Sequence, residues 1–296
     1  VGDGVDERDD LLGTRIAGRR FCTEEERPGD GRQNAVFNDV KIQVENMQDV
    51  QQLTLVFVQT FDLNIEDGIR IDVHAIVLGD IGCYTLGAQA PLFALDSTLC
   101  MGASVSGLHG FNKAGGSESE AKSVCVIGDS TFMHSGVTGL INIAYNGSNS
   151  TVIILDNSIT GMTGHQQNPT TGYNIKGDPA GKIDLESLCR AVGINRIRVV
   201  DPYDLDACEK ALREELAANE PSVIISRRPC VLLKYVKPKT PLEVDREKCK
   251  GCKKCMKFGC PAISIHNRKA AIDKTLCIGC EVCTQLCSFG AIGNGG

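Results

Sequence analysis

The chain of 296 residues contains no tryptophan, and aromatic residues make up only 5% of it. It has no run of about 18 apolar residues, so we expect no transmembrane helix. Its first residues lack the basic and apolar regions of a secretory signal. A net charge of −6 gives no sign of the basic surface that nucleic-acid binding requires. We therefore expect a protein that neither spans a membrane nor binds nucleic acid.

Cysteine, by contrast, is abundant. Of fifteen cysteines, eight lie between Cys249 and Cys287, and the other seven are scattered at irregular intervals. Irregular spacing in a large chain without a secretory signal is typical of reduced thiols rather than of a disulfide framework. We therefore expect a cytoplasmic protein, and we expect its clustered cysteines to carry chemistry.

The composition divides the chain into three parts. Residues 1–70 start with a stretch rich in Gly, Asp, Glu and Arg, which indicates loop or disorder, and Val44–Phe61 has a mixed pattern compatible with a helix. Residues 71–235 have the texture of an α/β domain. A stretch marked by Lys and Pro, Lys234–Pro241, reads as a linker to the cysteine-rich residues 236–296.

Short β-branched runs alternate with helical patterns in the central part. The expected strands are Ile71–Leu78, Ser123–Ile127, Thr151–Leu155, Arg196–Val200 and Ser222–Ile225, and the expected helices are Ser135–Tyr145, Leu185–Val192 and Tyr203–Ala218. Asp201-Pro202 predicts the start of the last helix, with an acceptor at the cap and proline at the first helical position. Buried strands alternating with helices indicate a parallel sheet flanked by helices on both faces.

The cysteine-rich part repeats one pattern twice. The first copy reads Cys249-x2-Cys252-x2-Cys255-x4-Cys260, and the second reads Cys277-x2-Cys280-x2-Cys283-x3-Cys287. Thiolates are soft ligands that select iron–sulfur clusters or zinc. In two-cluster ferredoxins the fourth cysteine of each run binds the other cluster.

That rule assigns Cys249, Cys252, Cys255 and Cys287 to one [4Fe–4S] cluster. It assigns Cys260, Cys277, Cys280 and Cys283 to a second. The part is therefore expected to be a small ferredoxin-like α+β domain that transfers electrons. A pair of zinc knots is the alternative, although zinc sites need only four ligands and commonly include histidine. The first run has one extra residue before Cys260, and the second has Ser288 where bacterial ferredoxins usually place proline.

Polar residues follow two neighbouring strands of the predicted sheet. Gly128-Asp129-Ser130 ends one strand, and Asn157 and Ile159 follow the next. Ligands of open α/β sheets bind at the carboxyl ends of the strands. A carboxylate, an amide oxygen and a backbone carbonyl suit Mg²⁺ with a diphosphate, and a helix from Ser135 could direct its amino end at the phosphates. The alternative is an ordinary turn at each strand end.

Several phrases, taken in order, resemble one enzyme family. They are Gly79-Asp80-Ile81-Gly82-Cys83-Tyr84-Thr85-Leu86-Gly87, Cys100-Met101-Gly102-Ala103-Ser104, Gly128-Asp129-Ser130-Thr131-Phe132-Met133-His134-Ser135-Gly136 and Met162-Thr163-Gly164-His165-Gln166. Together with the cysteine tail, residues 71–296 resemble the carboxyl-terminal half of the indolepyruvate ferredoxin oxidoreductase alpha subunit, in the 2-oxoacid:ferredoxin oxidoreductase family. The Gly-Asp-x…Asn pattern is similar to the thiamine diphosphate (TPP) motif.

The resemblance implies roles for individual residues. Asp129 and Asn157 would bind Mg²⁺ by their side chains, and Ile159 by its carbonyl. His134 and His165 are candidates for contact with substrate or phosphate, with a structural role as the alternative. The remaining residues expected to bind the cofactor are Gly79, Asp80, Ile81, Gly82, Cys83, Met101, Gly102, Ala103, Gly128, Ser130, Thr131 and Thr160.

The resemblance also implies an activity. A 2-oxo acid, in this family an arylpyruvate such as indolepyruvate, would be decarboxylated oxidatively to an acyl-coenzyme A, and the electrons would pass through the two clusters to ferredoxin. The family's glutamate that activates TPP belongs to a pyrimidine-binding domain that this sequence lacks. Residues 1–70 also lack the family's Cys-Pro-Gly-Cys-Pro-His phrase. We therefore expect a second subunit or protomer to supply that glutamate, and no turnover by this chain alone.

Three alternatives stay open at this point. No residue reveals the substrate side-chain pocket, so pyruvate or a branched-chain 2-oxo acid could replace the arylpyruvate. A TPP decarboxylase without redox chemistry would leave the cysteine tail without a purpose. An electron-transfer module with a vestigial TPP site would hold clusters but no cofactor.

Overall fold

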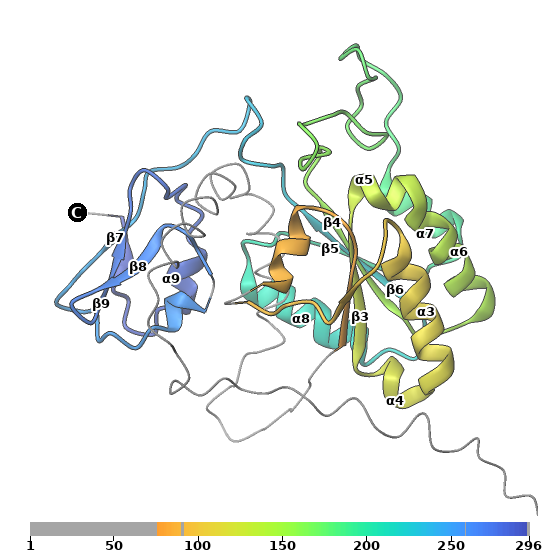
Figure 1. Ribbon diagram of the computed structural model, residues 1–296, viewed down its shortest axis with the longest axis horizontal. Helices are drawn as coiled ribbons and strands as arrows, with labels where there is room; N and C mark the ends of the chain where they lie inside the picture. Colours follow the sequence, from red (N-terminus) through yellow and green to blue (C-terminus); the bar gives the residue numbers. More distant parts are fainter. Residues whose placement is uncertain (1–75, 90–91, 258, 295–296) are drawn as a thin grey trace, which may run out of the picture. The chain divides into compact units, whose positions relative to one another are not determined.

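The computed structural model describes residues 76–89, 92–257 and 259–294. Its main element is a six-stranded sheet with the order β2-β1-β3-β4-β6-β5, in which every neighbouring pair is parallel (Figure 1). The strands are β1 (Ile76–Gly79), β2 (Ser97–Thr98), β3 (Ser123–Gly128), β4 (Thr151–Asp156), β5 (Arg196–Val200) and β6 (Ser222–Arg227). The predicted parallel α/β fold is confirmed. The expectations for residues 1–70, and for the start of the first strand, lie outside the described residues.

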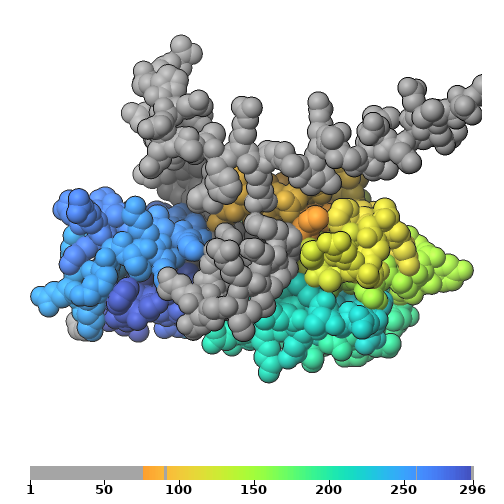
Figure 2. Space-filling view, turned by 90° about the horizontal axis from the view of Figure 1, so that it is seen from below, coloured from red at the N-terminus to blue at the C-terminus, as the bar shows by residue number. Residues whose placement is uncertain are grey.

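Helices cover both faces of this sheet. They are η2 (Cys83–Ala88), α3 (Ala103–Gly115), α4 (Ser117–Glu120), α5 (Asp129–Thr131), η3 (Phe132–Gly136), α6 (Val137–Asn146), α7 (Leu185–Ala191) and α8 (Leu205–Leu216). In Figure 1, α3, α6 and α7 lie on one side of the strands and α8 on the other. The outer sides of α3 and α8 form part of the yellow and cyan surfaces in Figure 2. No helix in the described ranges is long and apolar enough to cross a membrane.

The alternation of side chains along each strand explains why helices pack on both faces of the sheet. Val124 and Val126 of β3 pack with α8 and η2, whereas Cys125 and Ile127 pack with α3, α6 and α7. Successive side chains of a strand point to opposite faces, and both sets are almost fully buried. A strand buried on both faces needs an unbroken apolar run, and Val-Cys-Val-Ile supplies it. The sheet therefore rests between two cores that hold its carboxyl edge in place.

Two predicted helix starts are wrong. The helix expected to begin at Ser135 is the end of a helical run that starts at Asp129 and includes the π-helical turn η3. Asp129 therefore stands in the first helical turn. Helix α8 begins after Asp204, whose carboxylate accepts a hydrogen bond from the Ala207 amide. Asp201 is not the cap; its carboxylate binds the Arg228 guanidinium and accepts a hydrogen bond from the Tyr203 amide, in the turn before the helix.

The cysteine-rich part forms short elements around its own core. They are β7 (Glu243–Val244), η4 (Lys254–Met256), β8 (Ile263–His266), β9 (Lys269–Ile272), α9 (Val282–Leu286) and β10 (Ile292–Gly293), and the strands pair antiparallel as β8–β9 and β10–β7. The two cysteine loops repeat one backbone conformation. Gly251 and Gly279 both have φ of 68°, and Lys253 and Glu281 have φ of 61° and 66°. An added Cβ at Gly251 would collide with the Arg268 carbonyl, so glycine is required there.

Candidate cofactor site and cysteine sites

A pocket opens where β1, β3 and β4 end. These strands are neighbours in the sheet, so their following loops meet at one edge, where α/β sheets bind ligands. The lining residues come from these loops, from η2 and from the segment before α3. They are Ile81, Gly82, Cys83, Tyr84, Met101, Gly128, Asp129, Ser130, Thr131, Leu155, Asn157, Ile159, Thr160, Gly161, Met162 and Thr163.

Asp129 is the buried acidic group of this pocket. Its residue is only 2% exposed, and its carboxylate accepts hydrogen bonds from the Ser130 amide at 2.7 Å, Thr170 Oγ1 at 3.1 Å and Asn168 Nδ2 at 3.3 Å. Burial raises the pKa of Asp129 to about 7, and the nearby charge of Asp156 adds to the shift. All three donors are neutral, so none of them compensates the negative charge of the ionised carboxylate. A cation can therefore pair with it.

The second carboxylate at this edge has a partner of its own. Asp156 is 2.8 Å from the Arg227 Nε, and the same guanidinium reaches Glu186 at 3.0 Å. Arg227 therefore forms an ion pair with Asp156, whereas Asp129 faces the pocket without a charged partner among the described side chains. Beside them, Asn157 Oδ1 accepts a hydrogen bond from the Ile159 amide at 3.1 Å, which fixes the amide oxygen at the pocket.

Tyr84 ties two of the loops together. Its hydroxyl donates to the Ile81 carbonyl at 3.3 Å and accepts from the Gly128 amide at 3.0 Å. The side chain is buried, which raises its pKa, so the hydroxyl stays protonated and can fill both roles. A further link joins the Thr160 hydroxyl to Ser130 Oγ at 2.7 Å. These bonds fix the loops after β1, β3 and β4 to one another.

Asp80 supports the pocket without lining it. It is fully buried, and its carboxylate accepts hydrogen bonds from the amides of Ile81, Gly102 and Ser104 at 2.8, 2.9 and 3.1 Å. It thereby caps α3 from a distant point in the chain. Gly102 has φ of 86°, and an added Cβ would lie 2.9 Å from the Ser135 backbone, so this close approach needs glycine.

The structure brings most of the predicted cofactor residues to the pocket. Ile81, Gly82, Cys83, Met101, Gly128, Asp129, Ser130, Thr131, Asn157, Ile159 and Thr160 line it, whereas Gly79, Asp80, Gly102 and Ala103 do not. His134 and His165 are exposed and are also absent from the lining. The His134 ring contacts the Ser135 hydroxyl at 3.1 Å, and His165 has φ of 63°.

Sequence reasoning missed two residues that hold Asp129. Asn168 and Thr170 are 7% and 4% exposed, and the two side chains also bond to each other at 2.7 Å. They lie about forty positions after Asp129, in a segment without regular secondary structure. No period or spacing rule connects such a turn with a distant carboxylate. Asn-Pro-Thr-Thr reads simply as a turn from sequence alone.

The spacing rule predicts two sets among the eight cysteines of the tail. Burial raises the pKa of Cys255, and the charges of Cys252, Cys287 and Cys249 raise it further. Burial likewise raises the pKa of Cys283, together with the charges of Cys280, Cys260 and Cys277 and, least, of Cys255. Most of the cysteine charges that act on Cys255 and Cys283 come from the set that the spacing rule assigns to each, and the two sets of four stay a prediction. Within the described ranges, no three His, Cys, Asp or Glu side chains converge closely enough to hold a single metal ion.

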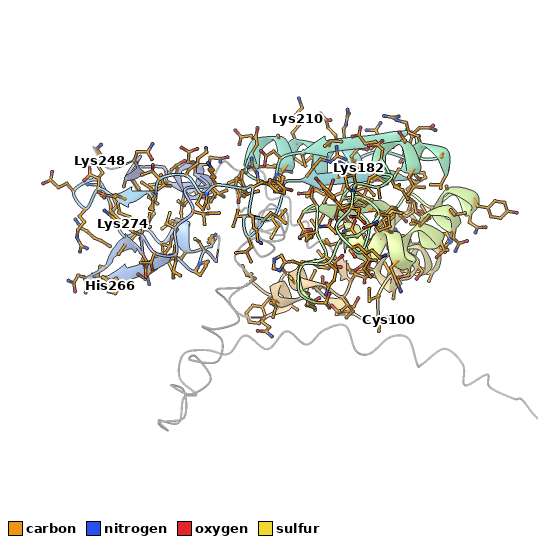
Figure 3. All side chains as sticks on the ribbon, turned by 90° about the horizontal axis from the view of Figure 1, so that it is seen from above. Cys100, Lys182, Lys210, Lys248, His266 and Lys274 are labelled. Carbon is orange, nitrogen blue, oxygen red and sulfur yellow. The ribbon has the colours of Figure 1, made fainter. Side chains whose placement is uncertain are left out.

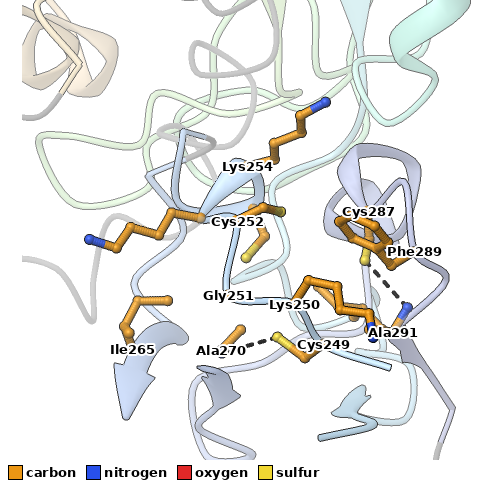
Figure 4. Close-up of a pocket in the computed structure, with 13 residues that line it drawn as sticks. Cys249, Lys250, Gly251, Cys252, Lys254, Ile265, Ala270, Cys287, Phe289 and Ala291 are labelled. Atoms are coloured by element: carbon orange, nitrogen blue, oxygen red, sulfur yellow. Dashed lines mark hydrogen bonds between the residues drawn. The ribbon is translucent and has the colours of Figure 1, made fainter. Parts of the chain in front are cut away.

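The first set surrounds one hollow. Cys249, Cys252, Cys255 and Cys287 all line it, as Figure 4 shows for three of them. The Ala270 amide donates to the Cys249 sulfur at 3.5 Å, and the Ala291 amide donates to Cys287 at 3.3 Å. The hydrogen bond from the Ala270 amide lowers the pKa of Cys249. Amide donors to sulfur stabilise thiolates, which are the ligand form for a cluster.

The donor sets fit the groups that the sequence implies. The pocket offers a buried carboxylate with a raised pKa, an amide oxygen and free backbone at strand ends, which suit Mg²⁺ with a diphosphate. A [4Fe–4S] cubane is larger than one ion, so its thiolates stand farther apart than the ligands of a single metal. Four cysteines around one hollow match that requirement.

Comparison with known proteins gives one family match and several relatives. Residues 80–226 match the family described as thiamine pyrophosphate enzyme, C-terminal TPP binding domain. The chain is 41% identical over 237 residues to the indolepyruvate oxidoreductase subunit IorA of Pyrococcus horikoshii, covering 74% of this chain and 36% of that subunit. The Thermococcus kodakarensis subunit is 42% identical over 236 residues, covering 73% and 36%. A 2-oxoglutarate:ferredoxin oxidoreductase structure from Magnetococcus marinus has 16% identity and a TM-score of 0.48, covering 61% of this chain and 62% of that chain.

The sheet region is therefore a TPP-binding domain of the thiamine pyrophosphate enzymes. The family indicated by the motif phrases is confirmed as well, because the chain is a homologue of the indolepyruvate oxidoreductase subunit IorA. It spans about a third of the length of these relatives.

Proposed function

We propose that this chain is the TPP-binding and electron-transfer portion of an enzyme that oxidises a 2-oxo acid to an acyl-coenzyme A and passes the electrons to ferredoxin. The observation that carries the proposal is the presence on one chain of a TPP-binding domain and of two sets of four cysteines. A decarboxylase without redox chemistry would have no use for the cysteines.

Asp129, Asn157 and the Ile159 carbonyl would hold Mg²⁺, and the Mg²⁺ would hold the diphosphate. When bound, TPP supplies a nucleophilic carbon and an electron sink for decarboxylation. Asp129 must lose its proton to bind the cation, and its pKa near 7 puts that loss close to neutral pH. Tyr84 and Thr160 keep the three loops at a fixed spacing, so the diphosphate would meet a site that is already formed.

The cysteine sets would hold two [4Fe–4S] clusters, for which Cys249, Cys252, Cys255 and Cys287 form cluster I. Cluster II would be held by Cys260, Cys277, Cys280 and Cys283. Ferredoxin would accept the electrons, and a second chain or protomer would supply the glutamate that activates TPP. The abundance of reduced thiols suits a cytoplasmic location.

The substrate we propose is an arylpyruvate, with indolepyruvate as the first choice, because the relatives carry that name. Pyruvate and branched-chain 2-oxo acids are the competing substrates. The full chain, co-purified with its partner chain, would be assayed for coenzyme A-dependent reduction of ferredoxin with each acid. A higher kcat/KM for pyruvate than for indolepyruvate would overturn the arylpyruvate choice and leave the reaction class standing.

The cofactor proposal has its own test. The chain would be reconstituted anaerobically with iron and sulfide, analysed for metal, and titrated with TPP in a calorimeter with and without Mg²⁺. We expect about eight irons per chain and Mg²⁺-dependent TPP binding that Asp129→Ala abolishes. Asp178→Ala, which changes an exposed carboxylate on the loop after β4, is the matched control. Eight irons without TPP binding would identify an electron-transfer module instead.

A further inference from the structure

The charge of the chain is distributed unevenly. Residues 236–296 contain eleven Lys and Arg against five Asp and Glu, which is a net charge of +6, whereas the whole chain carries −6. The rest of the chain therefore carries −12. Lys248 and Lys274 extend from this part in Figure 3 and belong to the basic excess. Solubility does not require residues 236–296 to be positively charged, so their net charge of +6 needs another explanation.

Three of these eleven basic residues line the hollow of cluster I. Lys250, Lys253 and Lys254 line it together with the four cysteines, and we call these three residues the lysine collar (Figure 4). All three are exposed. Lys248 is paired with Asp245 and Lys239 with Glu281. Within the described part of the chain, neither Lys250 nor Lys253 has an acidic partner.

Two other residues of the hollow are exposed as well. Cys252 is exposed, and Phe289, which lines the same hollow, is 46% exposed. Exposed aromatic side chains are common in the contact surfaces of protein interfaces.

Cluster II has different surroundings. Cys260 and Cys280 pack against the apolar core that contains Cys208 and Leu212 of α8. The Gln285 side chain accepts from the Leu205 amide and donates to the Tyr203 carbonyl, which ties this loop to the sheet region.

We propose that the lysine collar is the docking surface for a small acidic one-electron carrier protein of the ferredoxin class, and that electrons leave the chain from cluster I. The inference rests on the proposed function, because it requires the two clusters. The step is a single electron transfer: cluster I is oxidised by one electron, and the carrier's centre is reduced by one, with no bond made or broken. Complementary charge would steer the encounter and speed it, most strongly at low salt.

The test compares two variants of equal charge. The collar variant is Lys250→Glu with Lys253→Glu, and the control is Lys182→Glu with Lys210→Glu, two exposed lysines of the sheet region shown in Figure 3. Glu281 occupies the position equivalent to Lys253 with nearly the same φ, so glutamate is compatible with that backbone. Both variants change the net charge by the same amount, and only the location differs.

Each full chain would be reconstituted anaerobically, reduced with dithionite, freed of excess reductant and mixed with an acidic plant-type [2Fe–2S] ferredoxin. We expect the second-order rate constant of the wild type to fall as salt rises, and that of the collar variant to be about 10- to 100-fold lower at low salt. The control should match the wild type within about twofold.

The outcomes separate the two proposals. Iron analysis and the EPR signal of the reduced clusters must be the same in all three proteins, which shows that the variants are folded and loaded. With eight irons present, a collar variant at the wild-type rate, or a control slowed equally, would overturn the docking surface and leave the proposed function intact. A wild type that binds no cluster would overturn both.

Discussion

The most informative single change is Asp80→Asn, because it replaces one oxygen of a fully buried carboxylate without changing its size. The carboxylate accepts three backbone amide bonds, two of which reach the start of α3. An asparagine can still accept through its carbonyl, but its NH₂ group faces amide donors. At least one donor then loses its partner inside the protein, where neither water nor another acceptor replaces it.

The expected cost follows from these contacts. A hydrogen bond to a charged group contributes about 1.5–3 kcal/mol, and a buried unsatisfied donor costs about 1–3 kcal/mol. We therefore expect Asp80→Asn to lower the free energy of unfolding by about 2–4 kcal/mol. At about 2–4 °C per kcal/mol, Tm would fall by roughly 4–16 °C. TPP binding should weaken too, because Met101, beside Gly102, lines the pocket.

The assay is urea unfolding of the full chain, followed by far-ultraviolet circular dichroism, with calorimetric TPP titration of the same samples. Asp206→Asn, an exposed aspartate of α8, is the control and should change the free energy of unfolding by less than about 0.5 kcal/mol. If Asp80→Asn matched this control, the start of α3 would be held by other contacts, and the account of Asp80 would be refuted.

Three further results are expected. Thr170→Val removes a hydrogen-bond donor that lowers the pKa of Asp129. Mg²⁺-dependent TPP binding should therefore weaken about 10-fold in calorimetry. The control is Thr138→Val, which changes an exposed side chain of α6 and should not weaken TPP binding. Without Mg²⁺, Asp129 keeps its proton up to about pH 7 in the folded protein and loses it near pH 4 in the unfolded chain. The free energy of unfolding should therefore fall as the pH rises from about 4 to about 7. Asp129→Asn should abolish this contribution to the pH dependence of the free energy of unfolding. Glu215→Gln removes the buried negative charge that pairs with Arg196 and Arg198. Urea unfolding should show a free energy of unfolding lower by about 1–3 kcal/mol. The loss is smaller than for a fully buried ion pair, because both arginines are partly exposed to solvent.

The sequence was sufficient for five of the six strands because their signal is local, whereas the two-residue strand β2 was not expected. The runs Val-Cys-Val-Ile and Val-Ile-Ile-Leu are apolar on both faces, and only a strand covered on both sides tolerates that. The helix starts depended on competition that sequence does not display. Asp201 and Asp204 are both suitable caps from sequence; in the structure Asp201 holds the preceding turn and binds Arg228, twenty-seven positions later, while Asp204 caps α8.

The candidate site shows the same division. Asp129 and Asn157 could be found from sequence because each follows a strand directly, and adjacent parallel strands deliver such residues to one edge. Asp80 follows a strand as well, yet its carboxylate turns back to the amides of α3 instead of lining the pocket. Asn168 and Thr170 reach Asp129 from an irregular segment whose path is set by tertiary packing alone. The residues that support the site were therefore the ones that sequence could not reveal.

The two cysteine loops show how one backbone can serve two surroundings. Lys253 and Glu281 occupy equivalent positions with φ of 61° and 66°, so the loops impose the same conformation on opposite charges. Glu281 pairs with Lys239 of the linker at 2.8 Å, which ties the second loop to the chain that leads back to the sheet. Lys253 has no such partner among the described residues and faces solvent beside Cys252. The second loop is therefore tied to the linker by a surface ion pair, whereas the first loop leaves Lys253 available to a partner protein, as the proposed docking surface requires.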